Sequence, residues 1–128
     1  MDIYQNILVC VTKQKTCERL IKAASQRKAE DGNLHVLHVA KNSWNILDNA
    51  RESEAIEYLF KISKLYDAKM TMLRADNISD TIANFANKNN IHLIVLGATL
   101  NAEEHKFFKR LQVLLQGSNI EIEIITQK

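Results

Sequence analysis

Two cysteines and four histidines are the side chains in this sequence with the widest range of reactive chemistry. Cys10 lies in an apolar run and is expected to serve packing. Cys17 is expected in the first turn of a helix, where the helix dipole and the neighbouring Lys13 and Lys15 can lower the pKa of a thiol. Redox regulation through Cys17 is therefore one hypothesis, and a small half-buried residue is the competing interpretation.

The histidines are spaced poorly for a metal site. His35 and His38 lie three residues apart on one predicted strand, so their side chains point to opposite faces of the sheet. His92 opens another strand and His105 lies early in a helix, and neither has a cysteine or carboxylate partner at ligand spacing. We expect structural histidines and no metal ligand.

Other groups leave alternatives open. Trp44 follows the second strand, where its ring can stack on a base, cover a partner surface or pack against the next helix. Lys106, Lys109 and Arg110 form a basic cluster that either meets an anionic ligand or is a solvated helix face. No Gly-x-Ser-x-Gly elbow, phosphate-binding lysine motif or paired carboxylates occur, so the sequence predicts no enzyme.

Short apolar runs alternate with stretches of helical period along the whole chain. This alternation predicts an α/β fold, with a doubly wound five-stranded parallel sheet and helices on both faces. Residues 1–128 are expected to form a single domain. The strands are expected at 6–11, 34–39, 69–73, 92–97 and 120–124. The runs at 6–11 and 92–97 are apolar throughout and should be central, whereas 120–124 alternates and should be an edge that pairs with a second copy.

Four helices are expected between these strands. The first begins near Thr16 and is closed by Gly32. The second runs over 48–66 with Ile56, Leu59, Phe60 and Ser63 on its inner side, the third follows Asn77, and the fourth covers 103–116 before a turn at 117–119.

Composition limits the function classes. The net charge of +2 comes from scattered lysines, which argues against a nucleic-acid surface. No apolar run is long enough for a membrane span, and residues 1–6 lack the basic region of a signal peptide. The two cysteines form no disulfide framework, so a cytoplasmic setting is expected. Three glycines and no proline exclude a glycine-rich phosphate loop.

Ligands of such sheets bind beyond the carboxyl ends of the strands, where the winding direction reverses. The central runs end at Val11 and Gly97, so the loops 12–16 and 97–103 are the predicted site, with the segment after Val39 as a third wall. Gly97 is expected to provide a positive φ or a close backbone approach.

Three stretches of this sequence resemble the universal stress protein family. They are Ile7-Leu8-Val9-Cys10-Val11-Thr12 with Gln14, then Cys17-Glu18-Arg19-Leu20-Ile21-Lys22, then Leu34-His35-Val36-Leu37-His38-Val39. Within the family, the first two are most similar to the stress-protein domain of KdpD-type potassium sensor kinases. The resemblance implies a five-stranded parallel sheet, a homodimer formed through the last strand, a cytoplasmic location and no established enzymatic chemistry.

Many members of that family bind ATP through an aspartate after strand one, a backbone contact after strand two and a Gly-x2-Gly-x9-Gly-Ser segment after strand four. The matching positions here are Thr12, Val39 and Gly97, of which the last two fit. The second glycine is replaced by Leu100, and the final Gly-Ser pair by Arg110–Leu111. A leucine and an arginine obstruct the close backbone approach that phosphates need, so the ATP site is expected to be degenerate.

The sequence therefore predicts a small binding or regulatory module that acts through dimerisation and through sensing of a protein partner or small ligand, with no cofactor. The alternative is an adenine-nucleotide-binding protein that holds ATP, AMP or cyclic di-AMP at Thr12, Val39 and Gly97. The Ser-x-Ser signature associated with cyclic di-AMP is not seen after the first strand.

Overall fold

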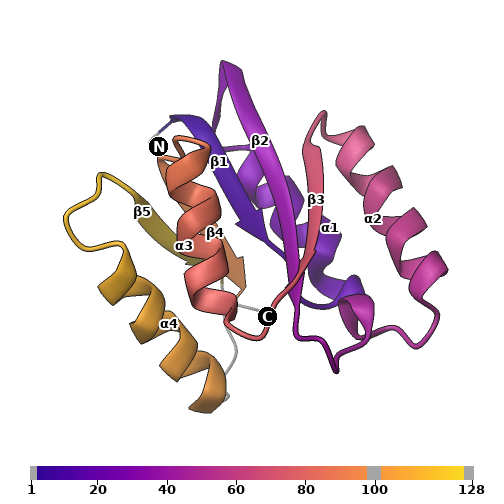
Figure 1. Ribbon diagram of the computed structural model, residues 1–128. Helices are drawn as coiled ribbons and strands as arrows, with labels where there is room; N and C mark the ends of the chain where they lie inside the picture. The colour runs from indigo at the N-terminus through magenta and orange to yellow at the C-terminus, as the bar shows by residue number, and fades with distance from the viewer. Residues whose placement is uncertain (1–2, 98–101, 126–128) are drawn as a thin grey trace.

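A computed structural model describes residues 3–97 and 102–125 of the chain. Its five strands form one sheet in the order β3-β2-β1-β4-β5, and every neighbouring pair is parallel (Figure 1). The strands are β1 (Tyr4–Cys10), β2 (Lys28–Ala40), β3 (Lys69–Arg74), β4 (Leu93–Gly97) and β5 (Glu121–Ile125). The predicted fold class is confirmed, with β1 and β4 at the centre and β5 at an edge.

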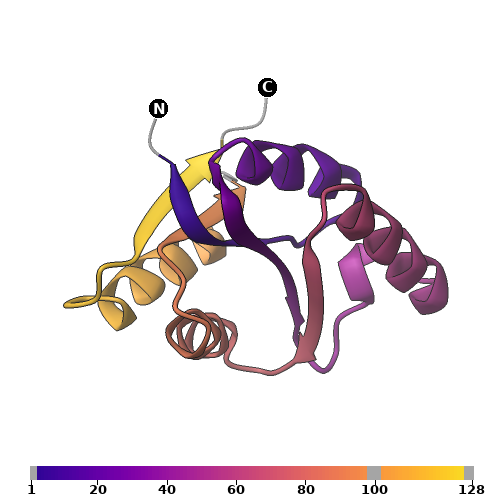
Figure 2. The same ribbon diagram turned by 90° about the horizontal axis from the view of Figure 1, so that it is seen from above.

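Four α-helices cover the two faces of this sheet. Figure 2 shows α1 and α2 on one face and α3 and α4 on the other. They are α1 (Gln14–Ser25), α2 (Glu52–Leu65), α3 (Ile78–Lys88) and α4 (Ala102–Leu114), with a short 3-10 helix η1 (Ile46–Asp48) between β2 and α2. None of the helices in these described ranges is long and apolar enough to cross a membrane.

The two central strands bury both of their faces, as their unbroken apolar sequences predict. Ile7 and Val9 of β1 pack with α1 and α2, while Leu8 and Cys10 pack with α3 and α4. In β4, Leu93 and Val95 join the first cluster, and Ile94 and Leu96 join the second. The molecule thus has two hydrophobic cores, one on each side of the sheet.

The predicted helix end at Gly32 is wrong. The α1 helix ends at Ser25, and β2 begins at Lys28, so Gly32 lies inside a strand. The register between β1 and β2 shifts there, from Tyr4 opposite Lys28 to Asn6 opposite Asn33. A Cβ atom on Gly32 would lie 2.4 Å from the carbonyl oxygen of Gln5. Close approach of two strand backbones, not helix termination, requires this glycine.

The inner face of α2 also differs from the prediction. Ile56 and Phe60 are 38% and 51% exposed, whereas Ala55 and Leu59 are fully buried. Ser63, also predicted to face inward, is buried as expected. The helix begins at Glu52 and not at 48, because η1 and an extended segment precede it. The buried face of α2 therefore runs through Ala55, Leu59 and Ser63.

Gly97, at the end of β4, and Gly117, after α4, have different structural roles. Gly117 has φ +82° and closes the turn after α4, as predicted. Gly97 does not adopt a positive φ, so this part of its prediction is wrong. Its close approach is to a side chain, since a Cβ there would lie 3.2 Å from Cδ1 of Leu20 in α1.

Candidate functional site at the carboxyl edge of the sheet

The three residues predicted to form the site lie at or just beyond the carboxyl ends of three neighbouring strands. Val9 of β1 is level with Val36 of β2 and Val95 of β4. Thr12, Val39 and Gly97 follow these positions by two or three residues, so all three reach the carboxyl edge. Thr12 and Gly97 are exposed, whereas the Val39 side chain is buried in the core and leaves only its backbone for a ligand.

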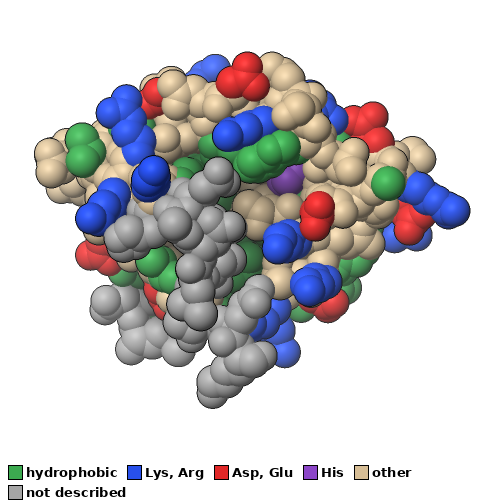
Figure 3. Space-filling view, turned by 90° about the horizontal axis from the view of Figure 1, so that it is seen from below, with side chains coloured by type: hydrophobic (Ala, Val, Ile, Leu, Met, Phe, Trp, Pro, Cys, Tyr) green, Lys and Arg blue, Asp and Glu red, His purple; other side chains and the backbone are tan. Residues whose placement is uncertain are grey.

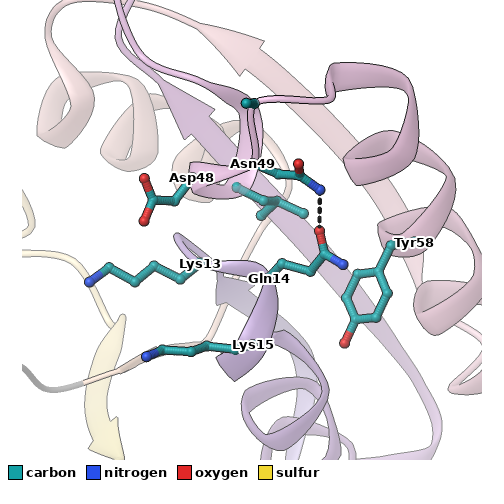
Figure 4. Close-up of a pocket in the computed structure, with 8 residues that line it drawn as sticks. Lys13, Gln14, Lys15, Asp48, Asn49 and Tyr58 are labelled. Atoms are coloured by element: carbon teal, nitrogen blue, oxygen red, sulfur yellow. Dashed lines mark hydrogen bonds between the residues drawn. The ribbon is translucent and has the colours of Figure 1, made fainter.

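A pocket of about 580 Å³ opens beside this edge, between the start of α1 and the segment around η1. Lys13, Lys15 and Asp48 extend toward one side of it, and Tyr58 of α2 stands on the other side (Figure 4). Its remaining lining residues are Gln14, Leu47, Asn49 and Ala50. The Asn49 side-chain amide donates a hydrogen bond to Oε1 of Gln14 at 2.8 Å, which joins the two walls. Thr12, Val39 and Gly97 do not line this pocket, although Lys13 directly follows Thr12.

Basic side chains dominate the surroundings of the carboxyl edge. Figure 3 looks onto this side of the molecule and shows several Lys and Arg side chains around a hollow, with fewer Asp and Glu side chains between them. Lys13 and Lys15 contribute two ammonium groups next to the first turn of α1, whose N-cap residue makes no side-chain capping bond. The positive end of the helix dipole and these lysines favour an anionic ligand.

His38 of β2 holds together two of the segments that form the pocket. It is only 2% exposed. Its Nδ1 lies 2.8 Å from the carbonyl oxygen of Val11, and its Nε2 accepts the backbone N–H of Leu47 at 3.0 Å. A carbonyl oxygen can only accept, so Nδ1 carries a proton. A backbone N–H can only donate, so Nε2 carries none, and the imidazole is therefore neutral. Burial is the main cause that lowers the pKa of His38, and the charge of Arg74 adds to it, against the opposing effect of the Val11 hydrogen bond.

Arg74, the last residue of β3, holds the segment after β2 by hydrogen bonds. This segment is the predicted third wall of the site. Its Nη1 donates to the carbonyl oxygens of Lys41 and Trp44 at 3.0 and 2.9 Å, and its Nη2 pairs with Glu52 of α2 at 3.1 Å. The Trp44 ring is 43% exposed, and the ammonium of Lys41 lies 5.3 Å from its centroid. The Trp44 ring does not line the pocket, and both interpretations of it, contact with a ligand or partner and packing against the next helix, stay predictions.

The hypothesis of a reactive Cys17 is contradicted. Cys17 is fully buried, its Sγ lies 3.2 Å from the carbonyl oxygen of Lys13, and burial raises the pKa of its thiol to about 12. Burial likewise raises the pKa of Cys10 to about 12. Desolvation of a thiolate outweighs the helix dipole here, because the side chain points into the core and not toward Lys13 and Lys15.

Two of the histidines, His38 and His35, have structural contacts. His38 has two hydrogen bonds, and His35 meets the Phe85 ring edge-on at 5.8 Å. The side chain of His105 lies outside the described residues. Within the described part of the chain, no group of three His, Cys, Asp or Glu residues is placed to hold a metal ion.

The positions of the phosphate-binding segment fall mainly in a helix. The β4 strand ends at Gly97 and α4 begins at Ala102, so Arg110–Leu111 lies inside α4. Leu111 is fully buried, and the guanidinium of Arg110 pairs with Asp80 of α3 at 3.4 Å. Leu100 lies outside the described residues. The side chains of Lys106, Lys109 and Arg110 are exposed, as in a solvated helix face.

The pocket contains residues that sequence reasoning missed. Leu47 and Asp48 have φ of 52° and 58°, in the left-handed region. The dipeptide Asp48-Asn49 signals such a turn, because Asp and Asn tolerate this conformation. Nothing in the residue type of Leu47 predicts it. Tyr58 was missed because it was not among the residues predicted for the inner side of α2.

Comparisons with known proteins agree on one family and fold. Residues 3–111 match the sequence model of the universal stress protein family. No curated protein matches the chain. Similar solved structures include a universal stress protein in complex with cAMP, at 15% identity and TM-score 0.65, covering 97% of this chain and 98% of that one.

Two further solved structures are similar over nearly the whole chain. The universal stress protein from Archaeoglobus fulgidus in complex with dAMP is 18% identical with a TM-score of 0.60, over 96% of this chain and 98% of that one. A universal stress protein family protein from Arabidopsis thaliana with AMP bound is 12% identical with a TM-score of 0.59, over 97% and 92%. At these identities the likeness shows the fold.

Proposed function

We propose that this chain, which belongs to the universal stress protein family, is a small binding and regulatory module with a degenerate ATP site and no enzymatic activity. The observation that carries this proposal is the position of Arg110–Leu111 inside α4. In the family pattern the same positions are a glycine and a serine that cradle phosphates.

The interior of a helix cannot supply such a cradle. Each backbone N–H in the middle of α4 is engaged in the bond to the carbonyl oxygen four residues earlier, so it is not free to bind a phosphate oxygen. The buried Leu111 side chain adds packing against α3 that a loop conformation would lose. A triphosphate would therefore find few of the donors that hold it in other members of the family.

An adenine nucleotide with a single phosphate is the second candidate ligand. The three solved relatives described above contain cAMP, dAMP and AMP, each with one phosphate. Here the Thr12 hydroxyl and the backbones of Val39 and Gly97 would meet the nucleoside, and Lys13 with Lys15 would neutralise the phosphate. This arrangement needs no glycine-rich loop. Cyclic di-AMP and ATP are the further ligands to compare.

Several broader features belong to the same proposal. We place the chain nearest to the stress-protein domain of KdpD-type kinases, because the β1 and α1 residues carry that resemblance. Residues 1–128 would form one cytoplasmic domain, which pairs with a second copy through β5. A protein partner in signalling would then respond to the occupied or empty site.

Thermal unfolding with a panel of ATP, AMP, cAMP and cyclic di-AMP tests the proposal. A ligand present at one hundred times its Kd stabilises the folded state by about 2.7 kcal/mol, a shift that is easily measured. We expect 1 mM ATP to give no clear stabilisation, which corresponds to a Kd for ATP above about 1 mM. Stabilisation by a monophosphate that Lys13→Gln abolishes, and that the matched Lys106→Gln on α4 preserves, would support the second candidate.

A further inference from the structure

The pocket walls meet at one buried side chain, His38. Its two ring nitrogens contact two segments far apart in sequence, with Nδ1 on the carbonyl of Val11 and Nε2 on the N–H of Leu47. Val11 begins the connection from β1 to α1, and Leu47 lies in η1, which packs against β2 and α2. Both segments continue directly into residues that line the pocket.

The backbone of Leu47 is in a conformation that its residue type does not favour. Leu47 and the next residue, Asp48, both have positive φ. A leucine in the left-handed region is strained, because its Cβ crowds the following carbonyl oxygen. The strain persists only where surrounding contacts hold the residue in place. Those contacts are the burial of the Leu47 side chain and the hydrogen bond of its N–H to His38.

We propose that His38 is a positioning residue that holds η1 in its pocket-forming conformation while the imidazole is neutral, and that protonation of His38 releases this segment. In the protonated ring Nε2 also carries a hydrogen, so it faces the Leu47 N–H as a second donor and the bond is lost. The bond from Nδ1 to Val11 survives, because that nitrogen donates in both states. Protonation of His38 therefore releases the pocket wall that contains Leu47 and leaves the contact with Val11 in place.

The charges around His38 determine where in pH this happens. Arg74 is the neighbouring charge that disfavours the imidazolium, and its guanidinium is itself held by Glu52. Cys17 stays a neutral thiol. The other titratable or charged groups at the ends of the surrounding elements include Lys13, Lys15, Cys17 and Glu18 at the start of α1, Asp48 of η1, and Glu52, Glu54, Glu57 and Tyr58 of α2. Burial and Arg74 lower the pKa of His38, so the segment stays in place at neutral pH and is released below the ordinary histidine range.

The inference deepens the proposed function, because the released segment lines the candidate ligand pocket. Its test needs no ligand, so a failure of nucleotide binding would leave the result interpretable. Trp44 is the single tryptophan of the chain and lies three residues before Leu47, so its fluorescence reports on this segment. Far-UV circular dichroism reports on the whole fold, and the amide exchange of Leu47 reports on the hydrogen bond itself.

The experiment titrates the full chain from pH 7.5 to 4.5 with these three readouts, on the wild type, His38→Gln and His35→Gln. We expect the protection factor of the Leu47 amide, which compares its exchange rate with the intrinsic rate at the same pH, to fall at least tenfold on acidification. The Trp44 emission should change over the same pH range, before circular dichroism changes. A glutamine can both donate to Val11 and accept from Leu47 without titrating, so His38→Gln should abolish both responses. His35→Gln, on the opposite face of β2, should keep them.

Two results would overturn the proposal. One is a transition in which Trp44 emission, Leu47 exchange and circular dichroism change together, since it would mean global acid unfolding. The other is a wild-type response that survives in His38→Gln, because another group would then control the segment. If His38→Gln does not fold, the ¹⁵N shifts of the wild-type His38 ring give the same decision, since they must titrate at the same pH as the Leu47 amide.

Discussion

At the scale of single residues, one residue type has different roles at different positions of this chain. His38 and His35 lie three residues apart on β2, yet one bridges two loops and the other packs against a phenylalanine ring. The three glycines also differ. Gly117 supplies a positive φ, Gly97 leaves room for Leu20, and Gly32 allows two strand backbones to approach.

Substitution of Gly32 tests this last assignment. In Gly32→Ala the new Cβ would meet the Gln5 carbonyl oxygen at 2.4 Å, and a backbone atom cannot move aside as a side chain can. We expect a loss of about 1–3 kcal/mol in the free energy of unfolding, measured by urea denaturation. The control is Gly97→Ala, where the nearest atom is the flexible end of Leu20 and the loss should stay below about 1 kcal/mol. Equal losses in the two variants would refute the assignment.

At the scale of elements, the sequence predicts the order and type of every strand and α-helix, because hydrophobic period and burial are directly linked. The unbroken runs of β1 and β4 and the alternation of β5 placed those strands correctly. The errors occur where local geometry, not burial, decides. The register shift at Gly32 depends on the pairing of β1 with β2, and η1 depends on the contact of Leu47 with His38. Neither contact is visible in a single stretch of sequence.

The candidate site was predictable to the same extent. The carboxyl edge followed from the ends of the two central apolar runs, and Thr12, Val39 and Gly97 lie at that edge. Their contact with a ligand stays a prediction. The pocket itself is built by Asn49, Tyr58 and other side chains from η1 and α2. Their convergence depends on the positive φ of Leu47 and Asp48 and on which face of α2 is buried. Both are decided by tertiary contacts.

The edge strand β5 pairs with β4 and is also linked to the segment between α1 and β2 by an ion pair. Arg27, which follows α1, contacts Glu123 through two hydrogen bonds of 2.5 and 2.6 Å, with 20% and 36% side-chain exposure. We expect Glu123→Gln to lower the free energy of unfolding by about 1 kcal/mol in urea denaturation, after allowance for solvent screening. The matched Glu57→Gln removes an exposed helix pair with Lys61 and should cost less than about 0.5 kcal/mol. A smaller loss for Glu123→Gln than for Glu57→Gln would contradict this.

At the scale of the whole molecule, β5 has an outer edge that no other strand of this sheet covers. Glu121 donates its N–H to His92 beside β4, so by strand alternation the N–H of Ile124 points away from the sheet. We expect a homodimer in light scattering, formed by antiparallel pairing of two β5 edges about a twofold axis. Ile124→Pro removes an outward donor without removing a bond to β4 and should give a monomer, whereas Ile124→Val should remain dimeric. A monomeric wild type at high concentration would exclude this assembly.

The universal stress protein fold and the position of Arg110–Leu111 are both features of the molecule as a whole. The carboxyl edge keeps Gly97 and a basic pocket, while Arg110–Leu111 is committed to α4. In the proposed function such a module would suit sensing, since it would keep a ligand site but lack the strongest contacts for a triphosphate.

Isothermal titration of the full chain with Mg·ATP, with AMP in a parallel titration, tests the central claim most directly. The degenerate site predicts no saturable heat from ATP at concentrations up to about 1 mM, whether or not AMP binds. A Kd for ATP in the micromolar range would contradict the account, because it would require a phosphate-binding arrangement that α4 does not provide.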